Sequence, residues 1–308
     1  MDCRTVDYHT AGEPFRIVLD GVPPIGGADV RIKRETARTT KEIDAVRRFL
    51  CHEPRGHADM YGCFVVEADD DGADFGALFW HKDGFSTACG HGTIALGRWA
   101  VDTGRVAGPD VTIDVPSGRV VATVGDDDVA FLNVPSYVLA RDAPAGEVRA
   151  DVAYGGAIYA FVPAASFGLT VTLDDLPALI AAGRDVKSAL QGTGVARHPT
   201  DDRLSGIYGT VLYENAPDGD GERNVTIFAD GEVDRSPCGS ATSARTALLM
   251  PSGPWRNTSI IGTSFTARVV EDTAMGVVTE VRGNAYKTGE HHFTLDPRDP
   301  LGTGFVLR

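Results

Sequence analysis

The pattern of apolar and polar positions along the chain predicts many short strands and few helices. Runs of about five apolar residues bounded by turn-forming residues are typical of buried strands. Two clear examples, 62–66 and 76–80, flank an acidic turn at 69–74. By the same criterion, strands are expected at 4–10, 15–19, 62–66, 76–80, 111–115, 120–124, 130–134, 157–162, 207–213 and 224–229. Because strands outnumber helices, the expected fold class is α+β.

Four segments have helical character. Residues 39–49 place apolar side chains on one face, and the run 173–190 is amphipathic, with Thr172 as its expected N-cap. The segments 93–101 and 242–250 carry small and apolar residues nearly all round. A helix with this pattern is buried on every side. We therefore expect these two segments to be central helices, each surrounded by strands.

The two expected central helices follow two copies of one motif, at 86–96 and at 236–245. Aligned on the cysteine, the copies share Cys-Gly, a Thr four residues after the Cys and an Ala two residues further on. One copy in each half predicts two similar lobes. The first lobe is expected to span 1–117 and the second 118–285, with a C-terminal strand at about 286–308 that returns to the first lobe.

Composition and charge exclude several classes of function. An apolar fraction of 43% is that of a globular protein with substantial cores. The net charge of −14 comes with no basic patch, so no nucleic-acid partner is expected. No segment approaches the roughly 20 apolar residues that cross a bilayer, and the N-terminal segment lacks the apolar core of a signal peptide. We therefore expect no membrane association and a cytoplasmic location.

The five cysteines are odd in number and irregularly spaced, which argues against a disulfide scaffold. Cys3, Cys51 and Cys63 have no special context and are expected to be core thiols. A lone Cys-Gly would be interpreted in the same way, as a buried structural thiol. Duplication at matched positions, each at a helix start, instead favours a chemical role for Cys89 and Cys238.

A cysteine at the first turn of a helix lies against open backbone amides and the positive end of the helix dipole. Both lower the pKa of the thiol and raise its thiolate fraction. The glycine that follows leaves neighbouring amides open to a ligand, and such amides bind carboxylates or phosphates. If the two lobes face each other, one thiolate can take a proton from one face of a bound carbon while the opposing thiol delivers one to the other face. This arrangement would invert a stereocentre without a cofactor.

Two further side chains fit this chemistry. A carbon next to an ionised carboxylate is a weak acid, so the site must stabilise the enolate-like charge that develops, which paired helix N-termini can do. Asp234, four residues before Cys238, is placed to bind the cationic amine of an amino-acid substrate. His91, two residues after Cys89, is placed to orient the carboxylate or to tune the first thiol.

Three ordered motifs carry a family resemblance: the opening Asp7–Pro14, the run Cys89–Thr93 and the run Asp234–Ser240. Together they resemble the proline racemase family, which includes proline racemases, 4-hydroxyproline 2-epimerases and trans-3-hydroxy-L-proline dehydratases. The resemblance extends from residue 4 to about residue 250. It implies the fold of diaminopimelate epimerase, with two pseudo-symmetric lobes, each a β-sheet curled round a central helix. It also suggests a homodimer that acts on a small-molecule substrate.

By the same resemblance, Cys89 and Cys238 match the two catalytic acid/base thiols, and Asp234 matches the contact to the ring nitrogen. The residues matched to a carboxylate cradle, through their backbone amides, are Gly90, His91, Gly239 and Ser240.

The second thiol distinguishes between the reactions of the family. Dehydratases typically carry Thr at the position that matches Cys238, because eliminating a 3-hydroxyl group needs only one thiolate. This chain keeps Cys, which favours a cofactor-independent racemase or epimerase acting at Cα of proline or hydroxyproline. The segments 152–157 and 228–233 resemble the dehydratase branch, so dehydration of trans-3-hydroxy-L-proline is the alternative function.

Two alternatives belong to other classes: a thiol redox protein that joins Cys89 to Cys238 in a reversible disulfide, and a non-catalytic binder of small amino acids. Metal chemistry is not expected. The segment His52–His57 has one residue too many for the helical His-Glu-x-x-His zinc motif, and its Pro and Gly would break the helix. We therefore expect neither a metal nor another cofactor.

Overall fold

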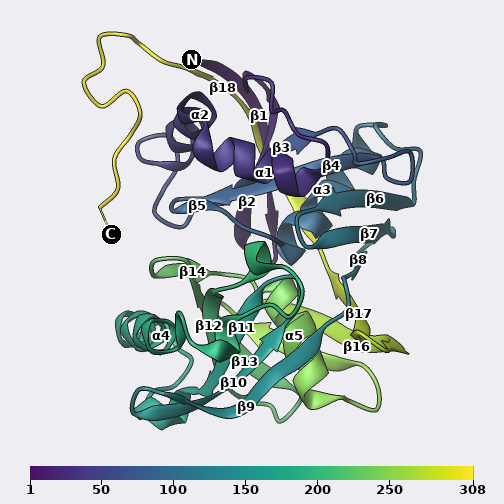
Figure 1. Cartoon of the computed structure of the whole chain (residues 1–308), viewed down its shortest axis with the longest axis vertical. Coiled ribbons are helices and arrows are strands. Elements are labelled where there is room, and N and C mark those ends of the chain that lie inside the picture. Colours follow the sequence, from purple (N-terminus) through teal and green to yellow (C-terminus); the bar gives the residue numbers. More distant parts are fainter. Residues whose placement is uncertain (308) are drawn as a thin grey trace. The chain divides into compact units, whose positions relative to one another are not determined.

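The computed structural model describes residues 1–307 and divides into two compact units (Figure 1). The first unit comprises Met1–Val129 together with the segment from Asn284 onward, and the second comprises Ala130–Gly283. Each unit combines many strands with a few helices, so the predicted α+β class is confirmed. The lobe boundaries expected from the sequence, near 117 and 285, stay a prediction.

The first unit is a mixed sheet with three helices. Its elements are β1 (Asp2–Thr10), β2 (Glu13–Asp20), α1 (Val30–Thr39), α2 (Lys41–Cys51), β3 (Gly62–Val66), β4 (Phe75–His81), β5 (Gly84–Phe85), α3 (Gly90–Asp102), β6 (Asp110–Val115), β7 (Gly118–Val124) and β18 (Ala285–Thr294). Strand β1 pairs antiparallel with both β2 and β18, which lies beside it as the yellow strand in Figure 1. Helices α1 and α2 connect β2 to the parallel strand β3.

The second unit repeats this plan. Its elements are β9 (Tyr137–Ala145), β10 (Val148–Tyr154), β11 (Ile158–Pro163), α4 (Leu176–Leu190), β12 (Ile207–Asn215), β13 (Glu222–Phe228), β14 (Glu232–Asp234), α5 (Gly239–Leu249), β15 (Trp255–Ser259), β16 (Ser264–Thr273) and β17 (Gly276–Gly283). Strand β8 (Val129–Leu132) begins at the division between the units, and the 3-10 helices are η1 (Ala164–Phe167), η2 (Gly194–Ala196) and η3 (Asp202–Leu204). Helix α4 connects β11 to the parallel strand β12.

Each unit carries its cysteine motif on the same kind of connection. In the first unit, β4 turns back into the short strand β5, and the chain passes Cys89 and α3 before it returns as β6, parallel to β4. In the second, β13 turns back into β14, and the chain passes Cys238 and α5 before it returns as β15, parallel to β13. The duplicated sequence motif is therefore matched by a duplicated order of elements.

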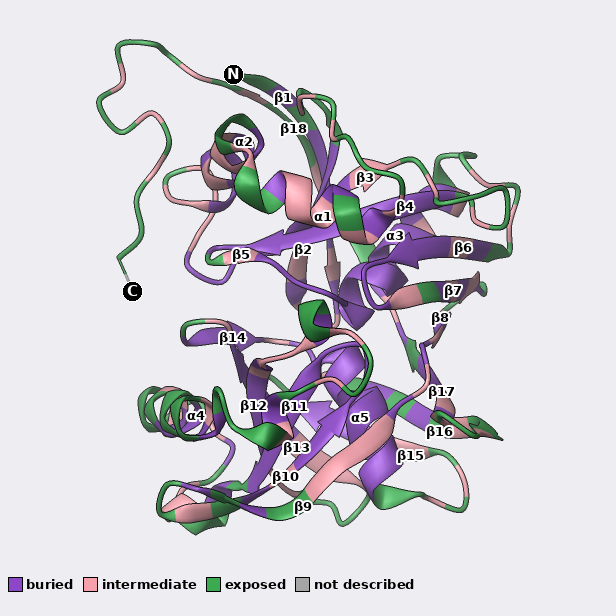
Figure 2. Cartoon of the chain, in the orientation of Figure 1, coloured by how far each residue is buried: buried purple, intermediate pink, exposed green. Residues whose placement is uncertain are grey.

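The two helices that follow the cysteines are the central helices of their units. Helix α3 contacts β1, β2, β6, β7 and β18, and α5 contacts β9, β10, β11, β16 and β17. Both helices are buried over most of their length, as Figure 2 shows. The close fit of α3 depends on Gly97, where an added Cβ would lie 2.6 Å from the Cβ of Ala122 on β7. The expectation of a buried helix within the sheet of each half is confirmed.

Helix α1 is not predicted by the apolar pattern. Its sequence is dominated by Arg, Lys, Glu and Thr, and only Val30, Lys33 and Ala37 are buried. Asp29 accepts a hydrogen bond from the amide of Ile32 and so caps the helix. Packing of α1 on α2 and on the sheet therefore stabilises a helix that hydrophobic periodicity alone does not indicate.

The starts of the other helices also differ from the sequence pattern. Helices α3 and α5 begin at Gly90 and Gly239, each three residues before the predicted start. The prediction of Thr172 as a cap was wrong, because α4 begins at Leu176 with Asp175 at the N-cap position and a proline in its first turn. The earlier starts matter for the site, since they make each cysteine the N-cap residue of its helix.

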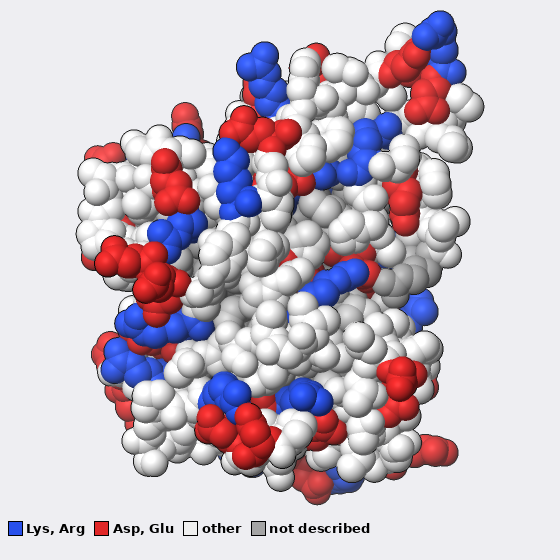
Figure 3. All heavy atoms as spheres, turned by 180° about the vertical axis from the view of Figure 1, so that it is seen from behind, with Lys and Arg blue, Asp and Glu red and all other residues white. Residues whose placement is uncertain are grey.

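The surface carries mixed charge. On the face shown in Figure 3, Lys and Arg side chains lie interspersed with Asp and Glu. Among the described residues, no helix combines the length and the apolar character that a membrane crossing requires. A face of this mixed kind offers no extended basic surface to a polyanion.

Candidate active site

Cys89 is the N-cap residue of α3 and is buried, with 5% of its surface exposed. Its Sγ accepts a hydrogen bond from the amide of Gly92 at 3.2 Å, and its carbonyl oxygen accepts from the amide of Thr93 at 2.9 Å. Gly92 is required here, because an added Cβ would lie 2.8 Å from Sγ and 2.5 Å from the ring of Phe15. The first thiol is therefore fixed against the amino end of the helix.

His91 lies beside this thiol. Both of its ring nitrogens are 3.5 Å from the Sγ of Cys89, and its ring packs edge-on against Tyr61 and Phe15, with centroids 4.9 and 5.7 Å away. Thr10 donates from Oγ1 to the carbonyl oxygen of His91. Burial lowers the pKa of His91 to about 3, so the imidazole is neutral near pH 7. It can act on Cys89 as a hydrogen-bonding group, but not as a cation.

Cys238 is the N-cap residue of α5 and has a left-handed backbone, with φ of 60°. A residue other than glycine adopts this conformation only where its surroundings hold it. The carbonyl oxygen of the preceding Pro237 accepts from Asn224 Nδ2 at 3.1 Å, Thr242 Oγ1 at 3.1 Å and Asn257 Nδ2 at 3.4 Å. These three donors hold the loop that presents the second thiol.

Asp234 holds the same loop from its other side. It is 3% exposed, and its Oδ1 accepts from the amide of Ser236 at 2.8 Å and from Ser236 Oγ at 2.7 Å. Ser236 Oγ in turn accepts from the amide of Cys238 at 3.1 Å. Ser236 therefore links the Asp234 carboxylate to the backbone amide of Cys238 by hydrogen bonds. The negative charge of Asp234 also acts on the Cys238 thiol.

The electrostatics of the second thiol differ from the sequence expectation. Burial raises the pKa of Cys238, and the nearby Asp234 carboxylate raises it further, although the amide of Ala241 and the hydroxyl of Tyr159 act in the opposite direction. The prediction that a helix start lowers this pKa was wrong for Cys238, because burial and the Asp234 charge outweigh the hydrogen bond from the amide of Ala241. In the resting protein this thiol carries its proton.

The predicted carboxylate cradle lies in the first turns of the two helices. The backbone ladder of α3 begins with Thr93 donating to Cys89, and that of α5 begins with Thr242 donating to Cys238. First-turn amides precede the ladder and point out of the helix end. In this position lie the amides of Gly90, His91, Gly239 and Ser240. The structure thus groups Cys89, Gly90 and His91 in one unit, and Asp234, Cys238, Gly239 and Ser240 in the other.

Two tyrosines near the thiols are missed by sequence reasoning. Tyr159 on β11 is fully buried, and its hydroxyl lies 2.7 Å from Ser240 Oγ and 3.8 Å from the Sγ of Cys238. Tyr61 hydrogen-bonds through its hydroxyl to Ser86 Oγ at 2.5 Å and contacts His91 through its ring. One signal was available for Tyr159: it is the only polar side chain within the apolar run 157–162, and a buried tyrosine hydroxyl needs a partner.

The pH dependence of stability tests the environment of Asp234. Burial raises the pKa of Asp234 from its ordinary 3.8 to about 6, so its favourable contribution to folding is complete below 3.8 and is lost as pH rises through about 6. Asp234→Asn removes this titration and keeps the oxygen that accepts both Ser236 bonds. The Tm of the variant relative to the parent, measured by calorimetry, is expected to rise with pH across this window.

The exposed Asp126 provides a matched control for this measurement. Asp126→Asn makes the same chemical change at an exposed side chain, and it reports any effect of the substitution that does not depend on burial. A constant or falling difference for Asp234→Asn would show that the buried carboxylate does not titrate as described.

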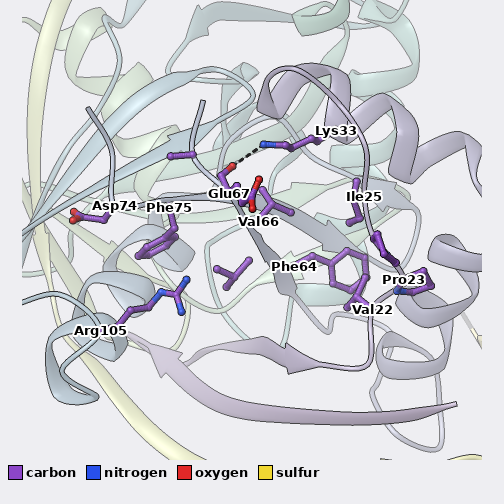
Figure 4. A pocket seen from close by; sticks show the side chains of 13 residues that line it. Val22, Pro23, Ile25, Lys33, Phe64, Val66, Glu67, Asp74, Phe75 and Arg105 are labelled. Carbon is purple, nitrogen blue, oxygen red and sulfur yellow. Dashed lines mark hydrogen bonds between the residues drawn. The ribbon is translucent and has the colours of Figure 1, made fainter. Parts of the chain in front are cut away.

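A separate cavity of about 630 Å³ lies in the first unit (Figure 4). Apolar side chains such as Ile25, Phe64 and Val66 line it, and Lys33 donates from Nζ to the carbonyl oxygen of Glu67 at its edge. None of the predicted site residues is among its lining residues. The cavity is therefore not part of the arrangement around Cys89.

Comparison with known proteins supports one family. The family model described as proline racemase matches residues 5–306. The chain is 41% identical to a protein of Bacillus cereus named trans-3-hydroxy-L-proline dehydratase, over 98% of this chain and 97% of the relative. It is also 41% identical to a protein of Burkholderia multivorans named 3-hydroxyproline 2-epimerase, over 99% of this chain and 98% of the relative.

A solved structure gives the same result for the fold. The crystal structure of a hydroxyproline epimerase from Agrobacterium vitis, with bound trans-4-hydroxy-L-proline, superposes with a TM-score of 0.90 at 30% identity, and the match covers 99% of this chain and 96% of the other. Because the family model and these relatives match almost from end to end, the chain belongs to the proline racemase family.

Proposed function

We propose that this chain is a cofactor-independent epimerase that inverts Cα of a hydroxyproline or of proline through Cys89 and Cys238. The observation that carries the proposal is the second thiol: Cys238 occupies the N-cap position of α5, as Cys89 does in α3. A single thiol at a helix start could remove a proton. Two thiols at matched positions supply both a base and an acid, as inversion requires.

The reaction conserves atoms and charge at each step. The Cα–H proton moves to the thiolate of one cysteine, and the electron pair left on Cα is delocalised into the carboxylate. The S–H proton of the other cysteine then moves to the opposite face of Cα, which leaves that sulfur as the new thiolate. The Cys238 thiol is protonated before the reaction, which suits it to donate the proton. Cys89 would then be the base that removes the Cα proton.

The first-turn amides and Asp234 supply the binding interactions of this proposal. The amides of Gly90, His91, Gly239 and Ser240 would hold the substrate carboxylate and stabilise the charge that develops on it. Asp234 would accept from the cationic ring amine, and a positive charge beside the buried carboxylate favours its ionised form. The neutral imidazole of His91 would orient the first thiol and add a hydrogen bond to the bound carboxylate.

Dehydration is the second candidate function, and the name of the Bacillus cereus relative favours it. In that reaction the same thiolate takes the Cα proton of trans-3-hydroxy-L-proline and the C3–O bond breaks. The proton from sulfur passes to the departing hydroxyl group, which leaves as water and restores the thiolate. The resulting cyclic enamine tautomerises to an imine. Epimerisation needs Cys238 as a proton donor to Cα, whereas elimination does not, so the presence of this thiol favours epimerisation.

The experiment compares three substrates in deuterium oxide: trans-3-hydroxy-L-proline, trans-4-hydroxy-L-proline and L-proline. We expect deuterium to enter Cα and the inverted isomer to appear on chiral chromatography, with 3-hydroxyproline tested first because the relatives at 41% identity carry it in their names. A cyclic imine as the main product would assign dehydration instead. Absence of both exchange and imine for all three substrates would overturn the proposal.

The proposal also has consequences for the cellular compartment in which the enzyme works. Thiol chemistry at Cys89 and Cys238 requires both sulfurs to be reduced, and all five cysteines of the chain are free thiols. A reducing compartment such as the cytoplasm keeps them so. We include in the proposal a cytoplasmic location, a homodimeric state and the lobe division at residues 117 and 285.

A further inference from the structure

The Sγ of Cys238 lies beside two hydroxyl groups that no part of the proposed mechanism uses. Tyr159 comes from β11 and Ser240 from the first turn of α5. Their oxygens are 2.7 Å apart, and Sγ lies 3.8 Å from the Tyr159 hydroxyl and 3.9 Å from Ser240 Oγ. The three atoms form a compact triangle inside the second unit.

The Tyr159 ring is held in place by aromatic packing. It lies edge-on to Tyr208 at 5.8 Å and tilted against Phe161 at 6.5 Å, and Tyr208 is itself stacked on Phe228 at 5.8 Å. Strand β11 pairs on both sides, with β10 and with β12, so its backbone has little freedom. A hydroxyl on such a ring is preorganised, and its hydrogen bond costs little further ordering.

Two titratable groups of the second unit act on Cys238: the Asp234 carboxylate and the Tyr159 phenol. Burial and Asp234 both favour the neutral thiol, whereas the amide of Ala241 and the Tyr159 hydroxyl favour the thiolate. A thiol that alternately donates and accepts a proton must be able to exist both as the protonated thiol and as the thiolate near the working pH. The Tyr159 hydroxyl therefore partly offsets the effect of the Asp234 carboxylate on the pKa of Cys238.

We propose that Tyr159 and Ser240 form a hydroxyl pair that positions the Cys238 sulfur and donates a hydrogen bond to its thiolate form. The role of this hydroxyl pair in catalysis rests on the proposed function. Its effect on the Cys238 thiol can be tested without substrate. Tyr159 is a positioning residue: Ser240 Oγ fixes the direction of the phenol, and the phenol stabilises the charge on sulfur when Cys238 has given up its proton.

The first unit shows a related pair in a different place. Tyr61 bonds to Ser86, but the imidazole of His91 and the amide of Gly92 lie against the Cys89 sulfur. The two thiols thus have different neighbours, hydroxyls for Cys238 and a neutral imidazole for Cys89. Loss of the Tyr159 hydroxyl should change the acidity of one thiol and leave the other as it was.

The test measures the reactivity of each thiol without substrate. Iodoacetamide alkylation is followed by peptide mass spectrometry at Cys89 and at Cys238 across the pH range in which the fold is retained. In Tyr159→Phe, the pH midpoint for alkylation of Cys238 is expected to rise by about one to two units, the effect of losing one hydrogen bond to a charged group. The midpoint for Cys89 should not move.

Tyr137→Phe is the matched control, since it removes a phenol from β9 of the same unit, where the ring stacks on Tyr154. It should leave both midpoints unchanged. If Tyr159→Phe does not fold, Ser240→Ala supplies the same readout and the same expected direction. An unchanged Cys238 midpoint in a folded variant overturns the proposal. A raised midpoint in a protein that shows no epimerisation would support the hydroxyl pair and remove the proposed function.

Discussion

Cys238→Ser is expected to abolish inversion at Cα while the protein remains folded. Serine is nearly isosteric with cysteine, so the loop held by Pro237 and Asp234 keeps its bonds. Its hydroxyl, however, is far too weak an acid to deliver a proton to carbon at the required rate. Loss of one general acid/base group slows a reaction by about 10² to 10⁴-fold. Chiral chromatography of the product measures the loss.

The same variant separates proton removal from inversion. If Cys89 is the base, deuterium should still enter Cα from one face with retention of configuration, and elimination from trans-3-hydroxy-L-proline should be less affected than inversion. Cys63→Ser is the control, because it makes the same chemical change at a buried thiol on β3, outside the site. Parent-like inversion in Cys238→Ser would exclude the two-thiol mechanism.

The sequence could predict those parts of the site that depend only on residues close together in the chain. A Cys-Gly pair followed by small residues at helical spacing predicts that a helix begins soon after Cys89 and again soon after Cys238, and the structure has both helices. The duplication sets these two thiols apart from Cys63, which lies on the buried strand β3. Local patterns of this kind survive folding because the N-cap and the first turn involve neighbouring residues only.

The parts that sequence could not predict depend on distant segments. Tyr159 precedes Cys238 by 79 residues, and only the pairing of β11 within the sheet brings the two together. The raised pKa of Cys238 has the same origin, since burial is a property of the packed unit and not of the helix start. Helix α1 could not be predicted from its own sequence, which has little apolar character, because its packing on α2 and on the sheet stabilises it.

The position of the second thiol is also expected to depend on Gly155, in the turn between β10 and β11. An added Cβ at this residue would lie 2.4 Å from the carbonyl oxygen of Ser240 and 2.8 Å from the amide nitrogen of Ala244. Both atoms belong to the backbone of α5, so the contact cannot be relieved by a side-chain rotation. Gly155→Ala must therefore push α5 and the turn apart.

The expected result of Gly155→Ala combines two effects. Overpacking of this kind destabilises a fold by about 1–3 kcal/mol, and displacement of a reacting group by about 1 Å can lower a rate by about 10²-fold. We expect a lower Tm and a loss of inversion that exceeds any loss of folded protein. Calorimetry and chiral chromatography on the same preparation measure the two separately.

Gly194→Ala is the matched control for Gly155→Ala, because an added Cβ there meets no atom within 4 Å among the described residues. It lies in the same unit, on η2, and makes the same chemical change. The control should keep the Tm and the activity of the parent. If Gly155→Ala also keeps the Tm and the activity of the parent, the amino end of α5 can shift without consequence. That result would contradict the two-thiol mechanism, which requires Cys238 to be held in a fixed position.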